Sequence, residues 1–519
     1  MRGTFLSEVE LKLLLEKQQV PDLLARIERL PPDARRVHES RLLRSIYLDT
    51  PDGALRENGI SLRLRRDGRR WLQTVKLDGS IAGGLSRVTE IEQPATAGAV
   101  SVDAIENDQV RDRIRKLVKD APLQTVAETH IRRTQVDLHL DDGTRAELAV
   151  DSGAIKAAGR SENLNELEIE LVEGKPGGLY RAARMILPEG ALRFSRLSKA
   201  ARSFLLAEHG HIEPPAGPQR ARSVPIDPKD SVHKAARDIL QECLAQIAAN
   251  IEAIQQTDDM EGPHQLRIGL RRLRSALALF AGALEPSAVA HYKNEARWLG
   301  REVGRLRDLE VVLNDIAKPF FAESPGAPGA ALVLGTLQRH AGEVRTDLRQ
   351  VLSAERVNEF LLGLSELTET GVHEKPPVPG KLRDLASEML EKRWKHVFAH
   401  ARGIDAFAVD EKHALRKELK KLRYAIEFLG PLYAPGGVKR MTGRLKTLQT
   451  VFGSLNDAAV ADVILSKPPL SSINDLAAQR AIGRLLGSCE TRTLYDWPAA
   501  REHWKALKEC RPFWKRRAR

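Results

Sequence analysis

Short segments that alternate between apolar and charged residues dominate the first two hundred positions of the chain. In SEVELKLLL, which begins at Ser7, a β-strand would place Glu8, Glu10 and Lys12 on one face and Val9, Leu11 and Leu13 on the other. The segments ISLRLRR, TVKL, VTEIEQ, RAELAVDSG and NELEIELVEG divide in the same way, and several are bounded by turn signals such as Asp-Gly. This pattern predicts an antiparallel β architecture, with helices over DQVRDRIRKLVKD and GLYRAARMIL.

Two arrangements satisfy these two-faced strands. The charged faces can lie in solvent around an apolar barrel core, or they can line a tunnel while helices cover the apolar faces outside. Burying charges is costly unless they are paired or bind ions. The strands carry clusters of acids and pairs of bases, and a metal–triphosphate complex needs both: oxygen ligands for the metal, and Arg or Lys for the phosphates. The pattern by itself leaves both arrangements open.

A proline-rich stretch, HGHIEPPAGPQRARSVPIDPK, separates this β-rich region from a second half with a different pattern. It has no hydrophobic period and predicts a linker at 209–229. Beyond it, long segments rich in Leu, Ala, Arg and Glu follow a helical period. The sequence therefore predicts an α+β N-terminal domain at 1–208 and an all-α domain at 230–519.

The helical half contains an internal repeat. GPHQLRIGLRRLRSAL matches EKHALRKELKKLRYAI when His264 is laid on His413, an offset of 149 positions. The same offset lays Asp308 on Asp457. Two motifs that share one offset predict two pseudo-symmetric copies of a helical unit, at about residues 230–370 and 380–519.

Each copy of the repeat places cations beside a leucine stripe on one helix. Basic helical faces are often simply solvated, and a lone histidine is more often structural than a ligand contact. However, QLRIGLRRLRSAL offers no acid to pair with its arginines, and the histidine recurs with the same neighbours. We therefore expect a shared cationic groove, with Asp308 and Asp457 orienting or neutralising the bases. Its predicted residues are His264, Arg267, Arg271, Arg274, His413, Arg416, Lys420 and Arg423.

Composition adds a charge asymmetry to this division. The 519 residues carry a formal charge of +12, of which residues 1–208 contribute +2 (34 Lys+Arg against 32 Asp+Glu) and the remainder +10. The excess in the helical half indicates a polyanionic partner there. No apolar run reaches the roughly 20 residues of a membrane helix, and no secretory signal is recognisable. Three widely spaced cysteines fit a reducing compartment, so we expect a cytoplasmic protein without a membrane partner.

The N-terminal strands resemble the CYTH family of triphosphate tunnel metalloenzymes. SEVELKLLL is similar to its E-x-E-x-K signature, and the later motifs follow in the family's order over roughly residues 2–205. The resemblance implies an antiparallel barrel with a charged lumen that cleaves triphosphates with Mg2+ or Mn2+. The matching motifs after the first are R-x-R at Arg63 and Arg65, then Lys76, R-x-x-E-x-E at Arg87, Glu90 and Glu92, Arg133, Glu147 and Asp151, Glu168 and Glu170, and Lys199.

The resemblance also implies roles for these residues. Metal ligands would come from the acids Glu8, Glu10, Glu168, Glu170, Asp151, Glu90 and Glu92. Phosphate oxygens would be held by the bases Lys12, Arg63, Arg65, Lys76, Arg87, Arg133 and Lys199. With Lys12 offsetting charge in the transition state, Glu168 or Glu170 would help a water attack the terminal phosphorus. Gln135 and Val136 depart from the family's pattern after the RRT-like segment, where the basic residue is Arg133 or Arg132.

The helical half resembles the CHAD domain over about residues 225–515. H-x-x-R-x-x-x-R-R-x-R stands at His264–Arg274 and G-x-x-R-D at Gly304–Asp308. The second copy is degenerate, with Lys420-Lys421 in place of two arginines. This resemblance implies binding of inorganic polyphosphate, and the basic stretch Lys392–Arg402 could extend the groove.

The combined expectation is an inorganic triphosphatase that cleaves tripolyphosphate in its tunnel and holds long-chain polyphosphate on its helices, at polyphosphate granules. Three alternatives stay open: action on an organic triphosphate (thiamine triphosphate, or ATP as an adenylate cyclase), a non-catalytic polyphosphate-binding protein, and a nucleic-acid binder. The last is disfavoured, because only 5% of residues are aromatic and could stack on bases.

Overall fold

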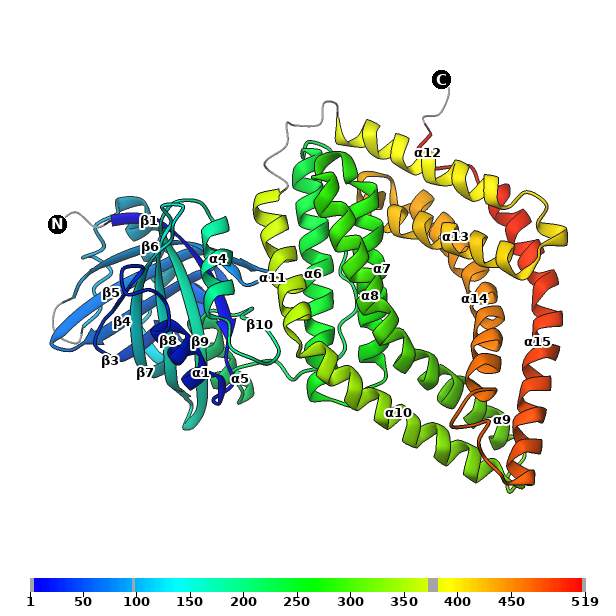
Figure 1. Ribbon diagram of the computed structural model, residues 1–519. Coiled ribbons are helices and arrows are strands. Elements are labelled where there is room, and N and C mark those ends of the chain that lie inside the picture. The colour runs from blue at the N-terminus through cyan, green and yellow to red at the C-terminus, as the bar shows by residue number, and fades with distance from the viewer. Residues whose placement is uncertain (1–3, 96–98, 372–380, 516–519) are drawn as a thin grey trace. The chain divides into compact units, whose positions relative to one another are not determined.

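The computed structural model describes residues 4–95, 99–371 and 381–515. It falls into two compact units, the first made of Met1–Ala216 with Ser353–Thr370 and the second of Gly217–Leu352 with Gly371–Arg519 (Figure 1). The sequence had predicted that all of 230–519 belongs to the helical domain. The structure instead groups 353–370 with the β-rich unit, because helix α11 (Glu355–Glu366) bonds to residues of that unit.

Eight antiparallel strands close the first unit into a barrel. Strand β1 (Thr4–Leu14) pairs with β6 on one side and with β9 on the other, which completes the closure. The order continues from β6 through β5, β4, β3, β7 and β8 to β9. The bounds are β3 Arg41–Asp49, β4 Ile60–Asp67, β5 Arg70–Ala82, β6 Leu85–Pro94, β7 Gln124–His139, β8 Arg145–Ala157 and β9 Arg160–Glu173. Two short strands, β2 (Arg35–Val37) and β10 (Arg193–Phe194), pair with β7 and β1.

The apolar faces of the strands lie outside the barrel, under helices. Side chains of β4, β5 and β6, such as Leu62, Val75 and Ile91, form one buried cluster with Leu55 of α2 (Ala54–Glu57) and Ile114 of α3 (Asp108–Val118). Because neighbouring strand residues point to opposite faces, the charged positions of these strands point inward. The tunnel arrangement is thereby confirmed, and the solvated arrangement is wrong.

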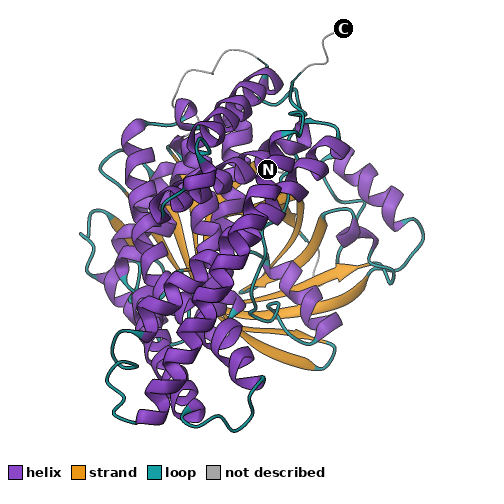
Figure 2. Cartoon of the chain, turned by 90° about the vertical axis from the view of Figure 1, so that its right-hand side faces the viewer, coloured by secondary structure: helices purple, strands orange, loops and turns teal. Residues whose placement is uncertain are grey.

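Further helices complete the first unit. Helix α5 (Lys199–His209) starts at Ser198, whose hydroxyl caps it by accepting from the Ala201 amide. Its Leu206 packs against Ile155 and Leu164 of the barrel wall, so its first residue, Lys199, is held at the cavity. The remaining helices are α1 (Gln19–Glu28) and α4 (Gly177–Ile186). All strands of the described residues belong to this unit (orange in Figure 2).

The second unit is helical, and its elements repeat at the offset found in the sequence. Helix α8 begins at Pro286 and α14 at Pro435, 149 positions later; the other three pairs of starts agree with this offset to within three residues. The first set is α6 (Val232–Gln256), α7 (Glu261–Leu279), α8 (Pro286–Glu310) and α10 (Ala330–Leu352). The second set is α12 (Leu382–His400), α13 (Val409–Leu429), α14 (Pro435–Leu465) and α15 (Leu476–Lys508).

The two repeats differ after their third helix. After α8 the chain continues as a π-helical stretch, Val311–Ala317, and the short α9 (Lys318–Ala322), whereas α14 runs on without interruption.

None of the described helices combines the length and the low charge that a membrane-crossing segment requires.

Candidate functional site

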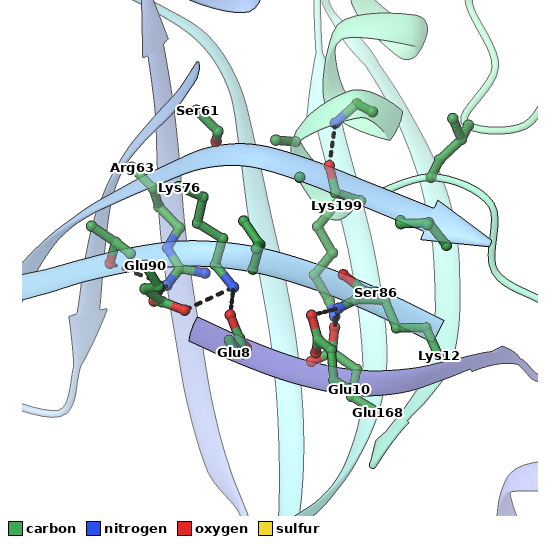
Figure 3. Close-up of a pocket in the computed structure, with 18 of the residues that line it drawn as sticks. Glu8, Glu10, Lys12, Ser61, Arg63, Lys76, Ser86, Glu90, Glu168 and Lys199 are labelled. Carbon is green, nitrogen blue, oxygen red and sulfur yellow. Dashed lines mark hydrogen bonds and ion pairs between the residues drawn. The ribbon is translucent and has the colours of Figure 1, made fainter. Parts of the chain in front are cut away.

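The barrel encloses a cavity of about 710 Å3 whose wall carries charges of both signs (Figure 3). Side chains of β1, of its two neighbours β6 and β9, and of the start of α5 point into it. Its acidic lining residues are Glu8, Glu10, Glu90, Glu92, Glu147, Glu168 and Glu170. Its basic lining residues are Lys12, Arg56, Arg63, Arg65, Lys76, Arg133, Arg196 and Lys199. The structure thus brings together all but two of the site residues predicted for the barrel.

One wall of the cavity is a dense network of ion pairs. The Lys12 ammonium lies 2.8 Å from Glu10 and also bonds Glu168, while Arg133 contacts Glu168 at 2.7 Å. Lys199 lies 2.8 Å from the same Glu168 carboxylate. Although burial acts to raise it, these three cations hold the pKa of Glu168 well below its ordinary range. Glu168 is therefore a permanently charged anchor for the basic side chains around it.

Two further acids support this wall from behind. Asp151 is fully buried and accepts from Arg133 at 2.7 Å, and it lies 2.9 Å from Lys199. Glu166, also fully buried, lies 2.6 Å from Lys199. Neither carboxylate lines the cavity. The prediction that Asp151 is a metal ligand is therefore corrected: its two oxygens face cations inside the wall.

A second wall of the cavity, which shares β1 with the first, contains another ion-pair group, centred on Lys76. Its ammonium lies 2.7 Å from Glu8 and 2.9 Å from Glu90 (Figure 3). The Arg63 guanidinium lies 3.6 Å from both Glu90 and Glu92. These pairs come from β1, β4, β5 and β6, so the pairing of neighbouring strands, rather than any local sequence, assembles them.

Three acids at the cavity are left without enough positive charge. Burial, together with the charges of Glu10 and Glu147, raises the pKa of Glu170 to about 7, and Glu170 forms no ion pair with a described residue. Burial raises the pKa of Glu8 to about 8, even though Lys76 opposes this shift. Burial also raises the pKa of Glu147. Buried carboxylates that repel one another are relieved by an added cation.

This donor set has the chemistry that a hard divalent cation prefers, since it consists of carboxylate oxygens with excess negative charge. Within residues 4–95, 99–371 and 381–515, however, no three acidic, histidine or cysteine side chains converge closely enough to hold an ion. Glu10 and Glu168 turn toward Lys12 instead. The residues fit a metal by their charge, while the ligand set Glu8, Glu10, Glu168 and Glu170 stays a prediction.

A cluster of guanidinium groups provides the complementary positive region. Arg65 donates to the Ser45 hydroxyl at 3.3 Å and has no carboxylate partner in the described chain. Burial and repulsion from Arg63 and Arg133 lower the pKa of Arg65 to about 10. Three buried guanidiniums that repel one another are a ready binding site for phosphate oxygens.

Arg87 was predicted to bind substrate, and the structure contradicts this. Its neighbours Ser86 and Val88 line the cavity, so Arg87 points to the outer face of β6, where it pairs with Glu369 at 2.8 Å. The spacing R-x-x-E already carries the reason, because Arg87 and Glu90 are three positions apart and lie on opposite faces of a regular strand. Arg133 lines the cavity, whereas Arg132 is exposed.

Sequence reasoning missed several lining residues. Glu147 was seen as part of a motif but not placed in the site, although it shares the inward face of its strand. Behind the lining, Glu166 shares its strand face with Glu168, but alternation does not predict that it is buried against Lys199. Tyr47, Arg56 and Arg196 line the cavity as well, and no pattern in their local sequence indicates this.

In the second unit, helices α7 and α13 lie against each other and bring the predicted bases together. Burial, followed by the charges of Arg271, Arg416, Arg267 and Arg423, lowers the pKa of Lys420 to about 6. Burial, and then Arg267, lowers that of Arg271 to about 10. Neither Lys420 nor Arg271 forms an ion pair with a described residue. The two repeats therefore supply one cationic cluster.

Other predicted residues of this cluster have different surroundings. Arg267 is paired with Asp308, as predicted for that acid, and Asp457 acts in the same sense on Arg416. Burial lowers the pKa of His264, and the nearby Arg307 adds to this effect. Burial, together with the charges of Arg297 and Arg301 of α8, lowers the pKa of Arg274. His413 is half-buried and forms no hydrogen bond with a described residue.

The second arginine of the R-R pair has a structural role. Arg272 is almost fully buried and donates to Glu427 of α13 at 2.8 Å and to Gln246 of α6 at 2.9 Å. Its guanidinium also lies 5.3 Å from the centre of the Phe428 ring. Arg272 thus fixes α7 against its neighbours and keeps the cationic side chains beside it in place.

Comparisons with known proteins agree with this division. The CYTH domain model matches residues 6–204, and the CHAD domain model matches residues 238–466. An uncharacterized protein of Mycobacterium tuberculosis is 28% identical over 447 residues, which cover 81% of this chain and 80% of that protein. An inorganic triphosphatase of Haemophilus influenzae is 28% identical over 210 residues, 40% of this chain and 56% of that protein.

Among solved structures, the CHAD domain from the plant Ricinus communis covers 57% of this chain and 98% of its own length. The TM-score is 0.50 and the sequence identity 26%. The barrel region and the helical region thus each match a known domain. The chain is built of a CYTH domain followed by a CHAD domain.

Proposed function

We propose that the barrel is a divalent-metal-dependent triphosphatase whose substrate is inorganic tripolyphosphate. The observation that carries this proposal is the separation of charge within one enclosed cavity. Burial and mutual repulsion raise the pKa of Glu170 beside Glu10 and Glu147, and the same cavity holds Arg65, which has no carboxylate partner among the described residues. The CYTH match and the triphosphatase relative support triphosphate hydrolysis in general.

Glu8, Glu10 and Glu170 would hold Mg2+ or Mn2+, with Glu147 close by. Such a cation, when bound, supplies Lewis acidity and neutralises phosphate charge. Arg63, Arg65 and Arg133 bind the phosphate oxygens and offset the charge that spreads over them in the transition state. Lys12 and Lys76 add positive charge from the two walls.

The two acids proposed from sequence as the proton acceptor have different environments. Glu168 bonds three cations, which keep it charged and weakly basic. Glu170 has no cationic partner among the described residues, so one of its oxygens can accept a proton while the other contributes to the metal site. We infer that Glu170 accepts the proton of the attacking water, while Glu168 holds Lys12 and Arg133 in position. Lys199, bonded to three carboxylates, acts on Glu168 rather than on phosphate.

A phosphate-release panel tests this proposal. Tripolyphosphate, thiamine triphosphate, ATP and long polyphosphate would be compared, each with Mg2+, with Mn2+ and with EDTA. We expect the highest kcat/KM for tripolyphosphate and loss of turnover in EDTA. Formation of cyclic AMP, or a preference for thiamine triphosphate, would reassign the substrate. No turnover of any substrate with either metal would favour a binding-only protein.

We further infer that the helical domain binds long-chain polyphosphate. The supporting observation is the crowding of Lys420, Arg271 and Arg416, whose mutual repulsion a polyanion would relieve. The test is retention of polyphosphate by the Arg271→Ala variant against Lys417→Ala, which removes one positive charge from an exposed position of α13. Equal retention by both variants would contradict the assignment. Competition with RNA at matched salt separates polyphosphate from nucleic acid.

A further inference from the structure

A segment from the helical half of the sequence is part of the barrel unit. Helix α11 and the π-helical residues that follow it, Glu355–Thr370 and here called the clasp, stand between the two helical repeats in the sequence and inside the range matched by the CHAD model. Their contacts are nevertheless with the barrel unit. Arg184 of α4 lies 2.9 Å from Glu359 and 2.8 Å from Glu366.

Polar bonds fix the clasp at defined positions. The Asn358 side chain accepts from the Leu192 amide at 2.8 Å and donates to the Gly190 carbonyl at 2.6 Å. Asn358 is buried, and a buried amide with both its groups bonded to backbone sets the register of a helix strongly. The clasp is therefore docked in one register and does not merely lie on the surface.

The clasp reaches the turn between β5 and β6 through a buried serine. The Ser365 hydroxyl donates to the Gly83 carbonyl at 2.8 Å and lies 3.0 Å from the Tyr180 hydroxyl. Ser365 and Tyr180 are both fully buried. Gly83 and Gly84 have φ of +56° and +81°, which the two central residues of a tight hairpin turn require.

The same turn holds the backbone of a cavity residue. The Lys12 amide donates to the Gly84 carbonyl at 2.8 Å. The approach is so close that a Cβ on Gly84 would lie 2.5 Å from the Phe194 ring and 3.1 Å from the Lys12 carbonyl. The Gly83 carbonyl, which accepts from Ser365, and the Gly84 carbonyl, which accepts from the Lys12 amide, thus belong to neighbouring residues. The ammonium of the same Lys12 binds Glu10 and Glu168 in the cavity.

A second contact acts on the next strand. Glu369, whose side chain is only 7% exposed, pairs with Arg87 on the outer face of β6. The inner face of β6 carries Ser86 and Glu90 into the cavity. The clasp therefore contacts, from outside, the β5–β6 turn that bonds the Lys12 backbone and the outer face of β6.

We propose that Ser365 and Glu369 are positioning residues of the barrel cavity. The helical half of the chain thereby contributes to the site in the N-terminal domain. Ser365 fixes the β5–β6 turn and with it Lys12, and Glu369 fixes β6. The kinetic consequence rests on the proposed triphosphatase function; the structural consequence does not.

Ser365→Ala tests the first contact, with Tyr180→Phe as its matched control. Both remove one hydroxyl from the same buried site, but only Ser365→Ala breaks the bond to Gly83. We expect faster amide exchange at Lys12 and in β6 for Ser365→Ala alone. We also expect its kcat for tripolyphosphate to fall by about tenfold at little changed KM. Exchange that is unchanged, or raised equally throughout the barrel, would overturn the proposal.

A charge swap tests the second contact. Glu369→Arg and Arg87→Glu should each speed amide exchange in β6, and the double variant should restore it. Glu355→Arg, at an exposed position in the first turn of α11, is the charge-matched control. Failure of the double variant to recover would refute the role of Glu369. If the wild type does not hydrolyse tripolyphosphate, the proposed function fails, while the exchange measurements still decide whether the clasp orders the cavity.

Discussion

The cavity of the barrel and the cationic cluster of the helical domain both gather basic side chains, but they balance the charge differently. In the barrel, Lys12 and Lys76 each lie within 3 Å of a carboxylate. In the cluster, Lys420 and Arg271 form no ion pair within the described residues, and burial together with neighbouring arginines lowers the pKa of both.

This difference separates two ways of holding phosphate. A cavity that contains both signs can accept a metal together with a short anion, and it can place a base beside the reacting atom. A cluster with little acid attracts any dense polyanion, needs no metal and offers no base. In the function proposed above, the barrel carries out the chemistry and the helices retain the polyanion.

The largest effect is expected for Glu170→Gln. Removing the proposed base should lower kcat for tripolyphosphate by about 100-fold or more and leave polyphosphate retention unchanged. Initial-rate phosphate release measures the first, and filter binding of long polyphosphate the second. Glu173→Gln, an exposed position at the end of the same strand, serves as control. A similar loss in both variants would remove Glu170 from its role.

Arg271→Ala combined with Arg416→Ala should act on the other side of the comparison. Retention of polyphosphate should weaken, and its dependence on salt should become shallower, because fewer counterions are released from the polyanion on binding, as for nucleic acids. Tripolyphosphate turnover should stay at the wild-type level. Loss of turnover in this variant would contradict the division of labour between the domains.

A smaller effect concerns the stability of the barrel and its dependence on pH. Folding raises the pKa of Glu8 to about 8 and that of Glu170 to about 7, from the ordinary glutamate value of 4.5. Between about pH 4.5 and these values the folded state binds more protons than the unfolded state, so the stability of the metal-free barrel falls as pH rises.

A cation that binds these carboxylates should restore the lost stability. The rise in Tm on adding Mg2+ should therefore be larger at pH 8.5 than at pH 6, and each kcal/mol of difference corresponds to about 2–4 °C. Differential scanning calorimetry measures this shift. A shift that is independent of pH, or equally large in Glu8→Gln, would contradict the assignment of these acids to the metal.

The smallest effect is expected from Lys420. Its pKa of about 6 means that it is mostly neutral at pH 8 in the free protein. A bound polyanion favours the charged form, so binding should take up a proton, and affinity should fall as pH rises above 6. Calorimetry in buffers of different ionisation enthalpy detects this uptake, which should vanish in Lys420→Ala. An unchanged proton count in that variant would assign the uptake to another group.

Alternation along the strands was sufficient to predict most of the barrel site. Glu8, Glu10 and Lys12 face the cavity because positions two apart share a face. The prediction for Arg87 is wrong because the order of a family's motifs does not determine which face of a strand a residue takes. Arg87 and Glu90 are three positions apart, so they lie on opposite faces of β6. Alternation decides only which face a side chain takes. It does not predict that the Glu168 carboxylate would form ion pairs with three cations.

Other features depend on contacts that no local pattern encodes. Ser365 bonds to Gly83, 282 positions away, and nothing in the helical period around it distinguishes such a contact from packing within a bundle. The repeat offset, by contrast, predicted the pairing of α7 with α13, because duplicated segments keep the same packing surfaces.

Chelation of divalent metal tests the central comparison most directly. One preparation of the full-length protein would be assayed in parallel for tripolyphosphate hydrolysis and for retention of long polyphosphate, with Mg2+ and with excess EDTA. We predict that EDTA abolishes hydrolysis and leaves retention intact. Hydrolysis that persists in EDTA, or retention that disappears with the metal, would contradict the assignment of two electrostatically distinct phosphate sites.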